Sequence, residues 1–149
     1  MAGELDYGTR DWVHVVFCGD FCGDCRDFVL ELDWKALRKD HYDSGVYIRA
    51  LAPAGRANWP KLNQVNLRQD LMGNIQENKK AVARPDLVKP GEWNQFRLIV
   101  VGSTAELLIN GTQAWKIDDL KPTTGLIGLQ CEVPGGGQFL FRNIRISER

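Results

Sequence analysis

The sequence predicts an all-β protein, built as an antiparallel sandwich or barrel of short strands. Apolar and polar residues alternate along most of the chain instead of recurring every three or four positions. Turn residues are frequent, with 15 glycines, and they divide the chain into roughly seven to nine short segments, as in sandwich folds. Because 149 residues is the usual size of one domain, we expect residues 1–149 to form a single sandwich.

Each expected strand is recognised by its alternation and by the turn residues that follow it. In 27–34, Phe28 and Leu30 fall on one face, whereas Glu31 and Asp33 fall on the other. Asn110-Gly111 is typical of a two-residue hairpin turn. We expect strands over 11–17, 27–34, 44–50, 63–69, 93–101, 105–109, 112–117, 125–132 and 138–146.

Two segments have no strand pattern of their own. Residues 33–39 contain helix formers, but they continue a strand and then reach the loop signal 43–45, so we expect no helix there. Residues 73–91 are polar and contain two prolines, which favours an ordered loop or short strands. We expect a core of Phe28, Leu30, Leu32, Val46, Ile48, Val65, Leu67, Leu98, Val100, Leu107, Ile109, Leu129 and Phe141, and we expect Trp34, Trp93 and Trp115, which fall within or beside strands, to belong to it.

The amino-acid composition limits the kinds of molecule that the protein is expected to bind. Nineteen basic and 19 acidic residues give a net charge of zero, which argues against nucleic acid or an anionic membrane surface as the main partner. No window is apolar for long enough to span a membrane, and the first six residues do not resemble a signal peptide. We expect an extracellular or periplasmic protein whose signal has been trimmed, rather than a cytoplasmic one.

Several strand positions that alternate with core residues carry side chains suited to sugar hydroxyls. Arginines, side-chain amides, a carboxylate and a tyrosine are the groups that bind hydroxyls in carbohydrate sites. The alternative is an ordinary solvated sheet face. The sequence predicts that one concave site for a carbohydrate ligand is formed by Tyr47, Arg49, Gln64, Asn66, Arg68, Gln130, Glu132 and Arg142.

Six stretches, taken in order, resemble the 3-keto-disaccharide hydrolase domain family, long known only as a domain of unknown function. They are 28–34 (FVLELDW), 44–49 (SGVYIR), 90–94 (PGEWN), 108–111 (LING), 128–130 (GLQ) and 141–146 (FRNIRI), and they fit the family from about residue 27 to the end. The resemblance implies a concanavalin A-like jelly roll, the fold of many lectins and glucanases. It also implies hydrolysis or elimination of 3-keto-sugar glycosides.

The chain departs from the family pattern at three places. The resemblance begins at about residue 27, after the position of an earlier block that members usually carry, so we expect either a trimmed or a short version of the domain. Gln64 stands where many members carry a glutamate, and Cys131-Glu132 follows Leu129-Gln130 where many members carry an acid or a histidine. Glu132 is therefore the candidate catalytic base, with Glu31 and Asp33 as further carboxylates. A non-catalytic carbohydrate-binding domain on the same sandwich remains the alternative.

Two further features have more than one interpretation. Cys18, Cys22 and Cys25 could hold a disulfide, bind zinc together with His14 or Cys131, or stay free, and we expect a structural rather than a catalytic role. Trp59 lies in a polar loop, where it could stack on a pyranose ring or anchor the loop over the core edge. The sequence identifies no cofactor, and we expect no metal in the sugar site.

Overall fold

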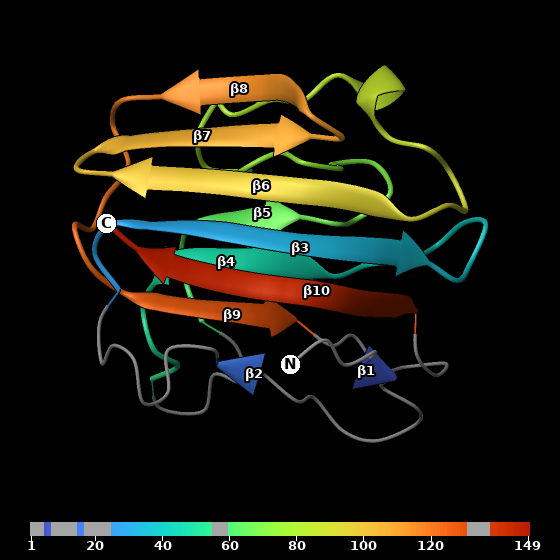
Figure 1. The fold of residues 1–149 in the computed structure, drawn as a ribbon, viewed down its shortest axis with the longest axis horizontal. Coiled ribbons are helices and arrows are strands. Elements are labelled where there is room, and N and C mark those ends of the chain that lie inside the picture. The colour runs from blue at the N-terminus through green and yellow to red at the C-terminus, as the bar shows by residue number, and fades with distance from the viewer. Residues whose placement is uncertain (1–4, 7–14, 17–24, 55–59, 131–137) are drawn as a thin grey trace.

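The computed structural model describes residues 5–6, 15–16, 25–54, 60–130 and 138–149. Within these residues the chain forms ten strands and one short 3₁₀ helix. The strands build a six-stranded and a four-stranded sheet, and every strand pair is antiparallel. In Figure 1 the six-stranded sheet lies in front of β4 and β5. The predicted all-β antiparallel sandwich is confirmed.

We call the two layers the front sheet and the back sheet. The front sheet has the strand order β1-β10-β3-β6-β7-β8, and the back sheet has the order β2-β9-β4-β5. The front-sheet strands are β1 (Leu5–Asp6), β3 (Phe28–Ala36), β6 (Asn94–Val101), β7 (Thr104–Ile109), β8 (Thr112–Ile117) and β10 (Phe139–Glu148). The back-sheet strands are β2 (Val15–Val16), β4 (Gly45–Ala50), β5 (Gln64–Asn66) and β9 (Leu126–Gln130).

The predicted strands are present, with some differences in length. β3 continues to Ala36, which confirms that residues 33–39 form no helix. β5 is shorter than expected because the backbone turns after it, where Leu71 N–H donates to the Arg68 carbonyl oxygen (3.0 Å). Of the segment predicted at 11–17 only β2 is described, and β1 was not predicted.

The apolar faces of the two sheets meet in one core. Every aliphatic residue and phenylalanine predicted for it is at most 2% exposed, and the aromatic side chains of Trp34, Phe96, Phe139 and Phe141 pack on one another. Aromatic pairs in this geometry add about 0.5–1.5 kcal/mol each to the free energy gained from burial alone. The alternation of β-strands therefore predicts the core well, because burial selects one face of each strand.

The segment between β5 and β6 closes one side of the core. Ile75 and Ala81 are buried, and the Trp115 indole N–H donates to the Gly73 carbonyl oxygen (2.7 Å). A 3₁₀ helix, η1 (Pro85–Leu87), follows. The expectation of an ordered loop at 73–91 is confirmed.

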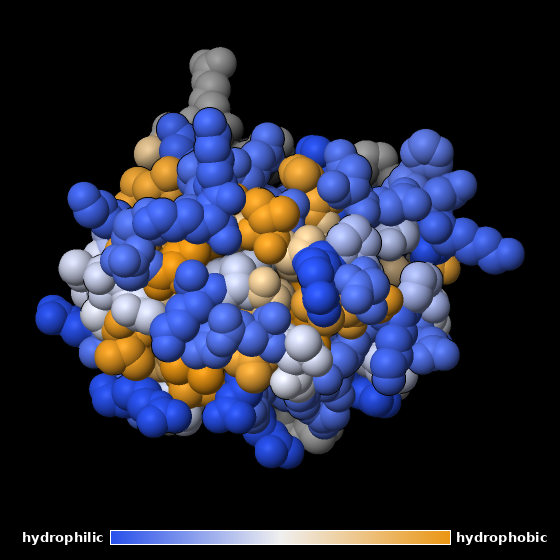
Figure 2. All heavy atoms as spheres, turned by 90° about the horizontal axis from the view of Figure 1, so that it is seen from above, coloured by the Kyte–Doolittle hydropathy of each residue, from blue (hydrophilic) through white to orange (hydrophobic). Residues whose placement is uncertain are grey.

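The surface mixes polar and apolar groups. Figure 2 shows hydrophobic side chains interspersed among hydrophilic ones on the side where β8 lies in Figure 1. The exposed large apolar residues include Leu37, Val82 and Val101, which come from separate segments. In the described part of the chain, no helix has the length and apolar character needed to cross a membrane.

Candidate functional site

Polar side chains gather on the outer face of the back sheet, where β5, β4 and β9 lie side by side. In the strand register Tyr47 is opposite Gln64, and Gly45 is opposite both Asn66 and Gln130. Residues opposite each other in antiparallel strands point to the same side of the sheet. We call this set, Tyr47, Gln64, Asn66 and Gln130, the back-sheet face.

Two glutamines join across the middle of the back-sheet face. The Gln64 side-chain amide donates to the Gln130 side-chain oxygen, which links β5 to β9 over the intervening strand β4. Gly45 makes this possible, because a Cβ there would lie 2.5 Å from Gln64 Cγ and 2.6 Å from Gln64 Cδ. The absence of a side chain at Gly45 therefore sets the position of Gln64.

The back-sheet face is polar but not freely solvated. Tyr47 is 4% exposed and Gln130 is 9% exposed, while Gln64 is half-buried. Asn66 supports the neighbouring loop, because its side-chain amide donates to the Asn74 carbonyl oxygen (3.0 Å). Polar groups held in low-dielectric surroundings have fixed directions, so the amides and the phenol of this face are held in place.

Beyond the end of β5, the back-sheet face is extended by two aspartates, Asp43 and Asp70, and by Arg68. The backbone pairing continues there, since Leu67 N–H donates to the Ser44 carbonyl oxygen (2.9 Å) and Gln69 N–H donates to that of Tyr42 (3.2 Å). Asp43 therefore lies opposite Arg68, in line with Gly45 and Asn66.

The charged groups at this end of the face lie in different surroundings. Arg68 makes two bonds to Asp70, from Nε to Oδ1 (2.5 Å) and from Nη2 to Oδ2 (2.8 Å), and this pair lowers the pKa of Asp70. Burial raises the pKa of Asp43, although the Arg68 charge opposes that shift. Asp43 is thus the carboxyl group at this face that takes up a proton more readily than usual.

Arg49 does not belong to this face, and the prediction that it points outward beside Tyr47 is wrong. Tyr47 pairs with Gly128 and Ala50 pairs with Leu126, so an advance of three residues along β4 corresponds to only two along β9. β4 therefore contains a bulge here. Arg49 has a φ of 47°, in the left-handed region, and its side chain is completely buried. A bulge inverts the alternation beyond it, which is why the sequence pattern failed at this position.

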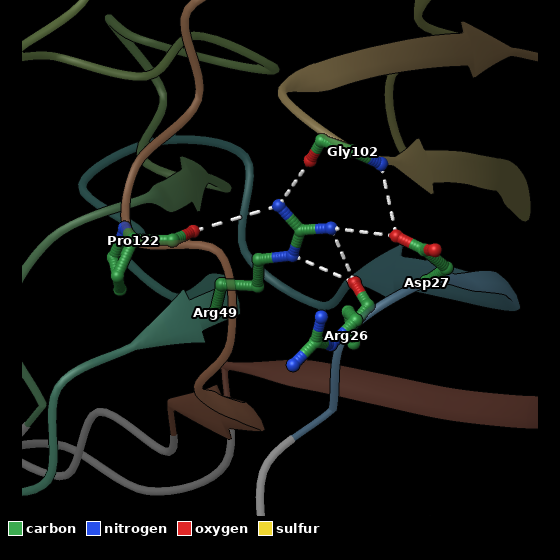
Figure 3. A network of polar contacts seen from close by, with 5 residues as sticks. All are labelled: Arg26, Asp27, Arg49, Gly102 and Pro122. Carbon is green, nitrogen blue, oxygen red and sulfur yellow. Dashed lines mark hydrogen bonds and ion pairs between the residues drawn. The ribbon is translucent and has the colours of Figure 1, made fainter.

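The buried Arg49 side chain instead ties four segments together, as Figure 3 shows. Its guanidinium donates to the backbone oxygens of Arg26 (2.7 Å from Nε), Gly102 (2.5 Å) and Pro122 (3.5 Å). Asp27 accepts from it as well, with 3.1 Å between Nη2 and Oδ1, and the same oxygen accepts from the Gly102 N–H (2.9 Å). Burial lowers the pKa of Arg49, against the opposing effect of Asp27. This network is structural.

Arg142 lies on the opposite side of the sandwich, so it cannot share a site with Tyr47. In β10 it is opposite Asp33 on the outer face of the front sheet, with 3.3 Å between Arg142 Nε and Asp33 Oδ2. Its guanidinium carbon lies 3.8 Å from the centre of the Trp93 ring. Trp93 is half-buried beneath it, so the expectation of a core position for this tryptophan is also wrong.

Several predicted residues lie outside the described part of the chain. Among them are Glu132, Trp59, Cys18, Cys22 and Cys131. Cys25 is described and is disulfide-bonded, which excludes a free thiol or a zinc ligand at this position. Among the residues that the structure describes, no three His, Cys, Asp or Glu side chains are grouped so that they could hold a metal ion.

Sequence reasoning missed two residues of the site, Asp43 and Gly45. Asp43 falls in the stretch 43–45, which was interpreted as a loop signal, and Gly45 was assigned to the strand 44–50 without a role in the site. The available signal was alternation, because Asp43, Gly45 and Tyr47 follow one another at a spacing of two residues and so share one face of a strand.

A separate hollow of about 480 Å³ opens beside the start of β5. It lies between Leu62, the 77–80 turn and residues 119–121. Lys80 contributes to its wall and is paired with Asp118 (3.1 Å) and Asp119 (3.0 Å). This hollow offers charged groups, whereas the back-sheet face offers amides and a phenol.

Comparison with protein families gives a match over most of the chain. A family model described as the 3-keto-alpha-glucoside-1,2-lyase-like domain matches residues 21–147. No curated protein matches the sequence.

Comparison with solved structures shows where the fold recurs. A protein of Parabacteroides distasonis that is assigned as a glycosyl hydrolase is 21% identical, with a TM-score of 0.69 over 99% of this chain and 90% of that one. The carbohydrate-binding module CBM66 of Bacillus subtilis is 13% identical, with a TM-score of 0.58 over 99% and 92%. The galectin LEC-6 of Caenorhabditis elegans is 14% identical, with a TM-score of 0.56 over 97% and 96%. At these identities the likeness shows the fold alone, and that fold is the concanavalin A-like sandwich.

Proposed function

Because this chain belongs to the family of 3-keto-alpha-glucoside-1,2-lyase-like domains, we propose that it cleaves glycosides of 3-keto sugars bound on the back-sheet face. Membership of this family gives the chain a carbohydrate-related function. The observation that supports the site is the strand register, which brings Tyr47, Gln64 and Gln130 to one face. A primary amide donates and accepts, so each glutamine can bind a sugar hydroxyl in either sense.

The chemistry needs one base and one acid. A ketone at C3 acidifies the proton on C2, so a carboxylate can remove it. The electrons of the C2–H bond form a C1–C2 double bond, and the bond from C1 to the glycosidic oxygen breaks. That oxygen leaves with a proton from an acid, and addition of water to the unsaturated sugar completes hydrolysis. Glu132 is the base in this proposal, as the family pattern implies, and donors near the sugar carbonyl stabilise the enolate.

Arg68 is proposed to act at the rim of this site. Its guanidinium is held by Asp70 and is 41% exposed, so it can contact a ligand without leaving its partner. Arg49 and Arg142 are not part of the proposed site, because Arg49 is completely buried and Arg142 lies on the front sheet. Trp59 stays as a proposed stacking residue.

A second candidate is a binding module without catalysis. The observation that favours it is Gln64, since an amide stands at the centre of the back-sheet face where many family members carry a glutamate. An amide binds hydroxyls but cannot act as a general base.

The experiment that separates the two candidates measures turnover and binding on the same protein. Release of 3-keto-glucose from 3-keto-glycosides is followed alongside a calorimetric titration with 3-keto-glucose. We expect turnover by the parent protein, and we expect Glu132→Gln to abolish it while binding falls by less than about tenfold, because a base acts mainly in the transition state. Unchanged turnover in Glu132→Gln would reject this base. Binding without any turnover in the parent would favour the binding module.

The disulfide at Cys25 supports a location outside the cytoplasm. Disulfides persist in oxidising compartments and are rare in the cytosol. We therefore propose that the protein works in the periplasm or outside the cell. Mass spectrometry of the protein from its native source, alkylated before lysis, would show Cys25 unmodified if this is correct and alkylated if it is not.

A further inference from the structure

Asp43 occupies the end of the back-sheet face and has no role in the function proposed so far. It lies opposite Arg68 and two residues before Gly45, whose neighbours across the strands are Asn66 and Gln130. Its backbone N–H donates to the side-chain oxygen of Gln138 (2.7 Å), a residue only 5% exposed. The position of Asp43 is therefore fixed by the segment that follows β5 and by Gln138, which directly precedes β10.

The charged groups that act on the Asp43 carboxyl are Arg68 and Asp70. Burial raises its pKa and is the largest influence, the charge of Asp70 raises it further, and Arg68 and the Ser44 backbone N–H lower it. Asp70 makes two bonds to the Arg68 guanidinium, so much of the arginine charge is already compensated. A half-buried carboxyl in these surroundings keeps its proton to higher pH than an exposed one.

We propose that Asp43 is the general acid that protonates the departing glycosidic oxygen. This inference rests on the proposed function and deepens it by naming the second proton-transfer group. In the elimination the base takes the C2 proton, the bond between C1 and the glycosidic oxygen breaks, and the Asp43 O–H proton passes to that oxygen. Asp43 is left as a carboxylate and regains its proton from water before the next turnover, so the proton count balances.

The test compares substrates whose leaving groups differ in how strongly they depend on protonation. A nitrophenol leaves readily as its anion, whereas an alkyl alcohol or a second sugar must be protonated as it leaves. We expect Asp43→Asn to lower kcat/KM by on the order of 10²–10⁴-fold for a 3-keto-glucosyl disaccharide and by less than about tenfold for nitrophenyl 3-keto-glucoside. The limb of the pH profile that falls as the acid loses its proton should also disappear in the variant.

Asp40→Asn is the matched control, since Asp40 lies three residues before Asp43 in the same loop and its side chain is exposed. We expect it to change the rates for both substrates equally and by less than about fivefold. Folding of Asp43→Asn is checked by thermal melting. Because a raised pKa in the folded state means that ionised Asp43 costs stability as pH rises through that pKa, the variant should melt no lower than the parent at pH 7.

The outcomes separate this inference from the proposed function. Equal losses on both substrates in Asp43→Asn, or no loss on either, would overturn the role of Asp43 while leaving 3-keto-glycoside cleavage intact. No turnover of either substrate by the parent protein would overturn both.

Discussion

Arg49 and Gln64 were expected to share one site, and the structure places them in very different surroundings. Arg49 is completely buried and bonds to backbone oxygens of three segments far apart in the chain. Gln64 is half-buried and bonds to one other side chain, on the outer face of the back sheet. A polar side chain bonded mostly to backbone stabilises the fold, whereas one bonded to another side chain at the surface can exchange that partner for a ligand. The two regions should therefore respond differently to mutation.

Replacing Arg49 should have the largest effect on stability. Arg49→Met keeps an apolar stem of similar length but leaves the oxygens of Arg26, Gly102 and Pro122 without these donors. We expect the free energy of unfolding to fall by about 3–5 kcal/mol, as for other buried charged groups that lose a partner. Chemical denaturation followed by tryptophan fluorescence measures this.

Arg142→Met is the matched control for that experiment. Arg142 is 41% exposed and makes a cation–π contact with Trp93 and an ion pair with Asp33. We expect a loss of at most about 1 kcal/mol. If Arg142→Met costs as much as Arg49→Met, the contrast between a buried structural arginine and a surface arginine is wrong.

Gly125→Ala, which adds a methyl group beside Arg49, should have the second-largest effect on stability. A Cβ on Gly125 would lie 2.5 Å from the Arg49 carbonyl carbon and 2.7 Å from the Ala50 oxygen, both of which are backbone atoms. Because backbone in a paired strand cannot move aside easily, we expect Gly125→Ala to cost about 3 kcal/mol, at the upper end of the usual cost of overpacking. A change in melting temperature close to zero would show that β4 is more compliant here than the structure indicates.

The same substitution at Gly45 should affect binding more than stability. The three atoms nearest to the added Cβ all belong to the Gln64 side chain, which can swing away. We expect Gly45→Ala to lose the bond between Gln64 and Gln130, at a cost of about 1 kcal/mol in stability. Affinity for 3-keto-glucose should fall by about tenfold or more, since Gln64 is then misplaced. Titration calorimetry measures the affinity, and an unchanged value would place the sugar away from Gln64.

The comparison also shows what the sequence could and could not predict. Core residues such as Phe28, Val46 and Leu107 were all found buried, because the alternation of a strand follows directly from its geometry. The same alternation placed Tyr47, Gln64, Asn66 and Gln130 on one face.

The alternation failed where the structure interrupts it or where two sheets are involved. The β4 bulge turned Arg49 inward, and no local signal in the sequence marks that bulge. Arg142 faces outward as expected, but from the other sheet, and parity along one strand does not say which sheet the strand joins. Asp43 was missed because its stretch was interpreted as a turn, although its backbone continues the pairing of β4 with β5.

A single nuclear magnetic resonance titration tests the central claim most directly. The side-chain amide signals of Gln64 and Gln130 and the Nε–H signal of Arg49 are followed in one sample as 3-keto-glucose is added. The signals of the two glutamines are assigned from the spectra of Gln64→Ala and Gln130→Ala. The account predicts saturable shifts of both glutamine amides and an unmoved Arg49 signal. A shifted Arg49 signal with both glutamine amides unmoved would contradict it.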